Sequence, residues 1–258
     1  MKLAWSMLKI LAAVYLLMLL LVVLFQRRLI YFPTPAPLEP VAEEFRVETR
    51  AGSQRGWVLH PDRPRAALYF GGNAEAVEHN LELFQAALPG RAVYLMPYRG
   101  YAGNPGRPSE RGILEDALAA YDQLAARHRS VAVIGRSLGS SVAVQLAAQR
   151  PVERLVLVTP FDSILRLAQR QFPVFPLSLL LRDKFESWRP APRITAPTLV
   201  LIAGRDGVVP AWSSQRLLQA LGPAGPEVVE IPDAGHNDIQ AYPVFSSAIA
   251  AFLGPGQE

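Results

Sequence analysis

The sequence contains no cysteine among its 258 residues. This absence excludes disulfide bonds, a thiol nucleophile and zinc sites with cysteine ligands. Histidine is scarce, with four residues, so a site that uses imidazole has few candidates. A basic excess is missing from most of the chain, because residues 1–28 carry four basic side chains and no acid and so account for the whole net charge of +4. With the rest of the chain balanced in charge, binding to nucleic acid is not expected.

Near the N-terminus, every residue from Ile10 to Phe25 is apolar or tyrosine. Counted from Leu3, this stretch is long enough to cross a hydrocarbon core of about 30 Å at ~1.5 Å per residue. A cleavable signal peptide is the first alternative, but the run ends in large and charged residues at 23–28, where cleavage requires small ones. A buried core helix is the second, but the segment lacks a polar face. We therefore predict an uncleaved, single-pass membrane anchor over residues 1–28, whose orientation stays open because basic residues flank both ends.

Residues 29–44 contain a proline-rich stretch, which predicts an extended, semi-rigid linker. Residues 45–258 form the remaining domain, in which short apolar runs alternate with helical patterns. The runs that predict strands are 45–49, 56–60, 66–70, 91–96, 130–135, 154–158, 198–203 and 227–231. The patterns that predict helices start at 74, 110, 138, 212 and 239. This alternation predicts an α/β domain with a mostly parallel central sheet and helices on both faces.

The run Gly135–Gly139 matches the pattern G-x-S-x-G between a predicted strand and a predicted helix. In such a turn the serine takes a strained backbone conformation that projects its hydroxyl above the sheet, and side chains at the glycine positions would collide. The pattern therefore predicts Ser137 as a nucleophile. The alternative is an ordinary turn in which Ser137 caps the helix.

A serine hydroxyl needs a base, and an acid that orients that base. Where the chain order is serine, acid, histidine, only His236 qualifies, because the other histidines precede Ser137. Asp206, just after the strand at 198–203, is the favoured acid. Four further aspartates near these motifs stay open as alternatives: Asp162, Asp183, Asp233 and Asp238.

Stabilising an oxyanion requires two hydrogen-bond donors. The backbone N–H of Leu138, directly after the nucleophile, is the first candidate, and the loop after the strand at 66–70 supplies the second. We assign the second donor to the backbone N–H of Asn73, with that of Gly72 as the fallback. Asn73 could instead cap a helix that begins at Ala74, and the two roles are compatible.

Seven short motifs together resemble those of known α/β-hydrolases: residues 69–74, 98–101, 108–110, 135–139, 159–163, 204–210 and 235–237. The resemblance covers residues 45 to 253 and is to the bacterial branch related to animal ABHD-type lipid and acyl-protein hydrolases, which often carry an N-terminal membrane segment. It implies the α/β-hydrolase fold, a location in a bacterial inner membrane, and hydrolysis of ester or thioester bonds in acyl or lipid-like substrates. Relatives usually have histidine where this chain has Gly71.

An irregular segment at 161–194 is too apolar for an exposed loop. Either it forms a cap that borders an acyl pocket, in which case Phe161, Phe175 and Leu179 contact substrate, or it packs on the sheet without touching substrate. The sequence as a whole predicts a serine hydrolase that forms an acyl-enzyme and needs no metal or organic cofactor. A peptidase of the same fold and a catalytically silent, membrane-tethered binding protein are the alternatives.

Overall fold

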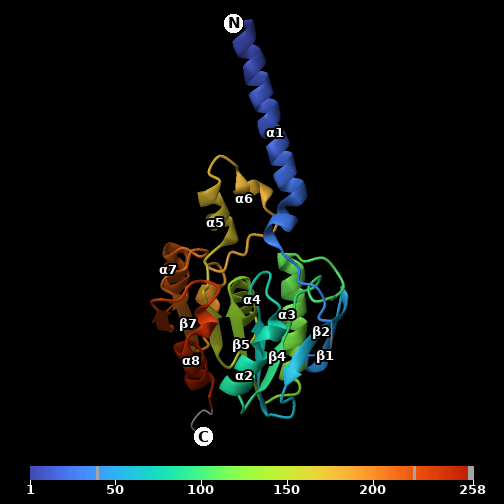
Figure 1. Cartoon of the computed structure of the whole chain (residues 1–258), viewed down its shortest axis with the longest axis vertical. Helices are drawn as coiled ribbons and strands as arrows, with labels where there is room; N and C mark the ends of the chain where they lie inside the picture. Colours follow the sequence, from blue (N-terminus) through green and yellow to red (C-terminus); the bar gives the residue numbers. More distant parts are fainter. Residues whose placement is uncertain (39–40, 223–224, 255–258) are drawn as a thin grey trace.

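The computed structural model describes residues 1–38, 41–222 and 225–254 of the chain. A long N-terminal helix, α1 (Lys2–Ile30), projects away from an α/β domain that holds all the other elements (Figure 1). The strands are β1 (Glu43–Thr49), β2 (Gly52–Leu59), β3 (Arg65–Phe70), β4 (Ala92–Leu95), β5 (Ser130–Arg136), β6 (Leu155–Val158), β7 (Thr198–Ala203) and β8 (Glu227–Ile231). The α-helices after α1 are α2 (Leu81–Ala87), α3 (Glu110–Ala125), α4 (Leu138–Ala147), α5 (Ile164–Gln171), α6 (Leu177–Leu180), α7 (Ala211–Ala220) and α8 (Pro243–Leu253).

The strands form one eight-stranded sheet in the order β1-β2-β4-β3-β5-β6-β7-β8. β1 and β2 form an antiparallel hairpin, β2 is antiparallel to β4, and β3 to β8 run parallel to one another. The carboxyl ends of the parallel strands therefore meet at one edge of the sheet, where ligands bind in folds of this class. This confirms the predicted mostly parallel sheet.

Helices cover both faces of this sheet. Alternate residues of β5 point to opposite faces: Val131 and Val133 pack in the core under α3, α4 and α7, and Ala132 and Ile134 pack in the core under α2 and α8. Since all four are at most 2% exposed, β5 reads as a continuous apolar run rather than as an alternating strand. The predicted arrangement of helices on both faces is confirmed.

Two predicted helices begin later than expected. A 3₁₀ turn (Ile239–Ala241) precedes α8, which starts at Pro243 because proline suits the first helical position, where no N–H donor is needed. After β3, the first helical residue is Val77, in a 3₁₀ turn (Val77–Asn80) that leads into α2. Ala74 has φ of 59°, in the left-handed region, so no helix begins there. The interpretation of Asn73 as the cap of such a helix is wrong.

The predicted linker is extended, but its described part is docked on the domain. Tyr31 is 3% exposed, and the N–H of Ala102 donates to the carbonyl oxygen of Thr34 at 2.9 Å. The ends of the predicted range belong to other elements, because α1 continues to Ile30 and β1 starts at Glu43. Positions 39–40 of the linker and positions 223–224 and 255–258 of the domain lie outside the described residues.

The irregular segment at 161–194 contains α5, α6 and a further 3₁₀ turn (Ala191–Arg193). We call its residues 161–185 the cap. α5 and α6 lie beyond the edge of the sheet at the carboxyl ends of the strands, next to the lower half of α1 (Figure 1).

Candidate active site

Ser137 lies in a tight turn between β5 and α4. Its φ of 49° is in the left-handed region, and its N–H donates to the carbonyl oxygen of Val158 at 2.9 Å. A Cβ on Gly135 would overlap the carbonyl of Gly139, and a Cβ on Gly139 would overlap the carbonyl of Phe70. These close backbone approaches are the physical reason why both positions are glycine.

The structure brings Ser137, His236 and Asp206 into one hydrogen-bonded chain. His236 Nε2 lies 2.9 Å from Ser137 Oγ, and His236 Nδ1 lies 2.8 Å from Asp206 Oδ2. Because an ionised carboxylate can only accept, Nδ1 carries the proton of the neutral imidazole, and Nε2 is the acceptor that faces the serine hydroxyl. The imidazole therefore has the tautomer that a base for Ser137 requires.

The carboxylate of Asp206 is fixed by its own loop. Its Oδ1 accepts the N–H groups of Val208 at 2.8 Å and Val209 at 2.7 Å. Burial raises the pKa of Asp206, but the hydrogen bonds from His236, Val209 and Val208 and the charge of His236 outweigh burial and hold this pKa below its ordinary value. Asp206 is consequently ionised at neutral pH and able to stabilise a protonated His236.

The aspartates left open by the sequence all have other partners. Asp162 pairs with Arg166 and accepts a hydrogen bond from Ser213, and Asp183 pairs with Arg27. Asp233 pairs with Arg205, and Asp238 accepts the N–H of Gly235. Only Asp206, among the described acidic residues, forms a hydrogen bond with His236.

The two backbone amides predicted to bind an oxyanion belong to Leu138 and Asn73. Within the part of the chain that the structure describes, the N–H groups of Asn73 and Leu138 donate to no protein acceptor. A Cβ placed on Gly72 would lie 3.7 Å from Ser137 Cβ, so the loop after β3 closely approaches the serine. The N–H of Gly72, the fallback donor, is already used, because it donates to Glu75 Oε2 at 2.5 Å.

A buried ion pair that sequence reasoning missed connects the loops of the site. Arg136 Nη1 lies 2.6 Å from Glu75 Oε2, and Arg136 Nη2 donates to the carbonyl oxygen of His236 at 3.1 Å. The same oxygen of Glu75 holds the N–H of Gly72. Arg136 and Glu75 thus tie the loop after β3 to the histidine loop. Position 136 falls inside the G-x-S-x-G pattern, which fixes only the glycines and the serine.

Two tyrosines fix the same loop from another side. The hydroxyl of Tyr98 donates to the carbonyl oxygen of Gly71 at 2.5 Å, and the hydroxyl of Tyr101 donates to Asn73 Oδ1 at 2.8 Å. The side chain of Asn73 also binds the end of α1, since its Nδ2 donates to the carbonyl oxygen of Ile30 at 2.5 Å. The run 98–101 is one of the motifs shared with α/β-hydrolases, but the sequence did not reveal that its tyrosines contact this loop.

An apolar cavity of about 770 Å³ lies between α1, the cap and the loop that carries Asp206. It is lined by Val22, Gln26, Leu29, Ile30, Phe32, Asn73, Ile164, Leu167, Ala168, Gln171, Phe172, Phe175, Leu177, Leu181, Val208 and Pro210. Of the three residues predicted to contact substrate, only Phe175 lines this cavity. Leu179 is 83% exposed on the outside of the cap, and Phe161 is 3% exposed in the core. Neither residue lines this cavity, because apolar character in the sequence does not show which way a side chain points.

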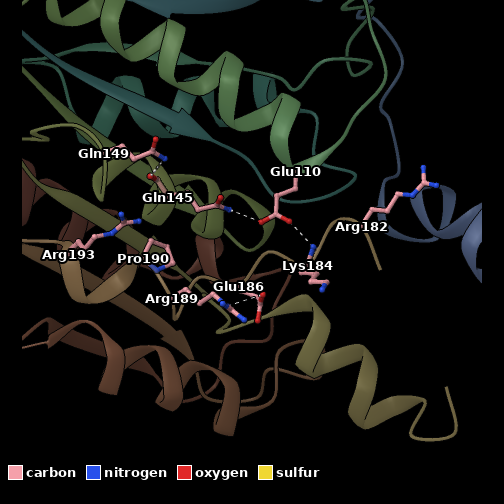
Figure 2. A pocket seen from close by; sticks show the side chains of 9 residues that line it. All are labelled: Glu110, Gln145, Gln149, Arg182, Lys184, Glu186, Arg189, Pro190 and Arg193. Atoms are coloured by element: carbon pink, nitrogen blue, oxygen red, sulfur yellow. Dashed lines mark hydrogen bonds and ion pairs between the residues drawn. The ribbon is translucent and has the colours of Figure 1, made fainter. Parts of the chain in front are cut away.

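A smaller cavity of about 320 Å³ lies near the N-terminal end of α3 and has charged walls (Figure 2). Its residues are Glu110, Gln145, Gln149, Arg182, Lys184, Glu186, Arg189, Pro190 and Arg193. Glu110 accepts the backbone N–H of Lys184 at 2.7 Å, and burial raises the pKa of this carboxyl. Neither cavity is lined by Ser137, His236 or Asp206. The apolar cavity is lined by Asn73 and Val208, which belong to the loop after β3 and to the loop that carries Asp206, so it lies closer to the site than the charged cavity does.

Sequence comparison finds relatives over most of the chain. An uncharacterized protein of Mycobacterium tuberculosis is 39% identical over 245 residues, which are 88% of this chain and 87% of that protein. The alpha/beta hydrolase domain-containing protein WAV2 of Arabidopsis thaliana is 29% identical, over 84% of this chain and 83% of its own. The lysophosphatidylserine lipase ABHD12 of Macaca fascicularis is 33% identical over 74% of this chain, which spans 56% of the lipase.

Structure comparison supports the same fold. The esterase Pf2001 of Pyrococcus furiosus superposes with a TM-score of 0.70 over 86% of this chain and 98% of the esterase, at 18% identity. No protein-family model matches the chain. On its sheet, its covering helices and these relatives, the chain belongs to the α/β-hydrolase family, in a bacterial branch related to the ABHD-type hydrolases.

Proposed function

We propose that this protein is a serine hydrolase that cleaves carboxylic ester or thioester bonds in acyl, lipid-like substrates through an acyl-enzyme. The observation that carries the proposal is the hydrogen-bonded chain from Ser137 through His236 to Asp206, with distances of 2.9 and 2.8 Å. The N–H groups of Leu138 and Asn73, which have no protein acceptor among the described residues, and an apolar cavity lined by Asn73 and Val208 support the assignment. The relatives named as a lipase and an esterase act on bonds of this class.

In the first half of the reaction, Ser137 Oγ attacks the acyl carbonyl carbon while His236 Nε2 takes the hydroxyl proton. The carbonyl oxygen becomes an oxyanion and accepts hydrogen bonds from the N–H groups of Leu138 and Asn73. When the tetrahedral intermediate collapses, the bond to the alcohol or thiol breaks, and His236 returns its proton to that leaving group. The acyl group stays on Ser137.

In the second half, a water molecule replaces the leaving group. His236 takes a proton from this water as the oxygen attacks the acyl-enzyme carbonyl, and the bond to Ser137 then breaks. The proton returns to Ser137 Oγ, and a carboxylic acid leaves. Asp206, which is ionised, stabilises the imidazolium in both halves.

We further propose that α1 is an uncleaved membrane anchor. It is 29 residues long, its most apolar 18-residue window has a mean hydropathy of 2.8, and none of that window is buried in the protein. Apolar burial in a bilayer resists salt and alkaline carbonate, whereas electrostatic attachment is lost in salt. The full-length protein should therefore stay in the membrane fraction after both washes. A mature N-terminus beyond Arg28 in mass spectrometry would overturn this part of the proposal.

The catalytic part is tested by covalent labelling of the full-length protein in detergent. A fluorophosphonate probe should modify one residue, Ser137, and should abolish hydrolysis of a short-chain ester. Ser137→Ala should lose both labelling and turnover while its thermal unfolding is unchanged. An absence of labelling in the wild type, together with no turnover of any ester in a series from acetate to palmitate, would contradict the proposal.

A further inference from the structure

The lower half of α1 is built into the domain through one face of the helix. Val22, Gln26 and Leu29, at a spacing that keeps them on one side of an α-helix, line the apolar cavity. Gln26 is 3% exposed; its Nε2 donates to the carbonyl oxygen of Leu180 at 3.1 Å, and its Oε1 accepts the N–H of Arg182 at 2.7 Å. These contacts fix α1 against the end of the cap, so α1 is more than a tether.

The cap also reaches far up α1. The hydroxyl of Tyr15 donates to the carbonyl oxygen of Val174 at 2.7 Å, and its ring stacks on that of Phe175 with centroids 5.9 Å apart. A membrane span needs about 20 residues. Within Lys2–Ile30, every window of that length contains Tyr15. Wherever α1 sits in a bilayer, the tip of the cap beside Tyr15 therefore lies at the depth of the hydrocarbon.

The cap tip, residues 172–175, has an apolar surface that suits the hydrocarbon depth of a bilayer. Phe172 and Val174 are 52% and 69% exposed, and Leu179 on the same side of the domain is 83% exposed. Such apolar exposure in one small segment is unfavourable in water but favourable in contact with lipid tails. The residues of the cap tip thus continue the apolar surface of α1.

The apolar cavity extends from the cap to the loops that carry the site. Phe172 and Phe175 of the cap line it, and so do Asn73 of the loop after β3 and Val208 of the loop that carries Asp206. None of its lining residues, all within the described chain, is charged. Two of its three polar side chains have protein partners: Gln26 binds the cap backbone, and Asn73 binds Ile30, Phe32 and Tyr101. The third, Gln171, is exposed. The wall offered to a ligand is therefore mostly apolar.

We propose that α1 and the cap together form an acyl-chain groove that opens sideways into the bilayer. One acyl chain of a membrane-resident ester enters between Val22 and Phe175, so that its carbonyl reaches Ser137 while its tail stays in an apolar environment throughout. The N-terminal helix is thus a wall of the substrate site as well as an anchor. This inference rests on the proposed hydrolase function and names its substrate class: esters whose acyl chain is held in a membrane.

The test uses full-length protein reconstituted in phosphatidylcholine vesicles, with 4-methylumbelliferyl acetate and 4-methylumbelliferyl palmitate as substrates. Val22→Trp places a large side chain in the groove. Leu24→Trp is the matched control, because Leu24 is 63% exposed, lies on the opposite face of α1 and does not line the cavity. Both changes add the same side chain to the same apolar segment.

We expect Val22→Trp to lower the ratio of palmitate to acetate turnover by about tenfold or more, since it removes several buried methylene contacts. Leu24→Trp should leave that ratio within about twofold of the wild type. An unchanged ratio in Val22→Trp, including equal losses on both substrates, would overturn the groove proposal. So would the same fall of this ratio in Val22→Trp and Leu24→Trp. These outcomes differ from failure of the hydrolase proposal, in which the wild type hydrolyses neither ester and Ser137 is not labelled.

Discussion

The rim that carries Ser137, His236 and Asp206 differs sharply from the groove between α1 and the cap. On the rim, strand ends, glycine contacts and a buried ion pair fix every group, and the side chains of His236 and Asp206 are 7% and 9% exposed. In the groove, segments distant in sequence meet through few contacts and leave apolar side chains open. The hydrogen bonds of the rim all lie within the folded chain, whereas the proposed groove would have its apolar surface covered by a bilayer around α1. If both proposals hold, chemistry and substrate selection are separable by mutation.

The largest effect should come from removing the nucleophile or the base. Ser137→Ala and His236→Ala should each lower kcat for a short-chain ester by roughly 10⁶-fold, because groups that act as a unit lose nearly all their effect together. The acetate ester is the right substrate, since it does not depend on the groove. Activity within about a hundredfold of the wild type in either variant would show that another group performs the chemistry.

The next effect should come from the acid. Asp206→Asn keeps the shape of the side chain, but it removes the charge that stabilises protonated His236 and disfavours the required tautomer. We expect kcat to fall by ~10³–10⁴-fold. Near-normal turnover in Asp206→Asn would require a different acid, although no other described aspartate contacts His236.

Because the pKa of Asp206 is lowered in the folded protein, Asp206→Asn should also change how the free energy of unfolding depends on pH. A carboxylate whose folded-state pKa is depressed stabilises the fold at every pH above its unfolded value, about 3.9, and loses that contribution as the pH falls through the folded value. The difference in free energy of unfolding between the wild type and Asp206→Asn should therefore shrink as the pH falls below about 4. Chemical denaturation at several pH values between about 5 and 2 measures it; a difference that grew over this range would contradict the assignment.

A third effect should come from the ion pair that ties the rim together. Glu75→Ala leaves Arg136 buried without its partner and frees the loop that carries Asn73. Breaking a buried pair in this way destabilises a protein by about 3–5 kcal/mol. We expect kcat to fall by about 10–100-fold with little change in KM, because the loop holds an oxyanion donor rather than a substrate contact. Glu44→Ala, which breaks surface pairs with Arg46 and Arg55 far from the site, is the control and should change neither quantity.

The rim was predictable from the sequence because its constraints are local. Strain at Ser137 and the absence of space beside Gly135 require particular residues at fixed spacing, and the serine–acid–histidine order left one histidine. The choice among the aspartates could not be made locally, since each follows or borders a strand or motif. Glu75 and Arg136 were missed because their pairing joins β5 to a loop 61 positions away in the sequence.

The groove was predictable only in its apolar character. Residues 172–181 are apolar in sequence whether they face lipid, core or ligand, so Leu179 and Phe175 looked equivalent although one is exposed and the other lines the cavity. The docking of α1 depends on Gln26, a lone polar residue at the end of an apolar run, whose partners lie 154 and 156 positions away. Pairing over such a distance leaves no periodic signal.

Because Phe175 lines the cavity and Leu179 does not, alanine substitutions at these two positions form a matched test of the groove. Phe175→Ala removes a large side chain from the wall of the groove, so kcat/KM for the palmitate ester should fall by about tenfold and the preference for long chains should flatten. Leu179→Ala should leave this preference within about twofold, because its side chain points away from the cavity. An ester series from acetate to palmitate, below micelle-forming concentrations, measures both. Equal effects of the two changes would place the acyl chain elsewhere.

The smallest effect should come from the contact that holds the cap tip to α1. Tyr15→Phe removes the hydrogen bond to the carbonyl of Val174 but keeps the ring stacked on Phe175. A hydrogen bond contributes about 0.5–1.5 kcal/mol, and this one is exposed, so we take the lower end of the range, about 0.5 kcal/mol. Palmitate turnover in vesicles should therefore fall by roughly two- to threefold while acetate turnover stays unchanged. The ratio of the two rates separates a loosened cap from a general loss of folded enzyme. Tyr15→Ala, which also removes the stacking, should deepen the loss on palmitate alone. If both variants behaved like the wild type on both esters, the cap would hold its position through Gln26 alone, and the contact beside Tyr15 would play no part in binding.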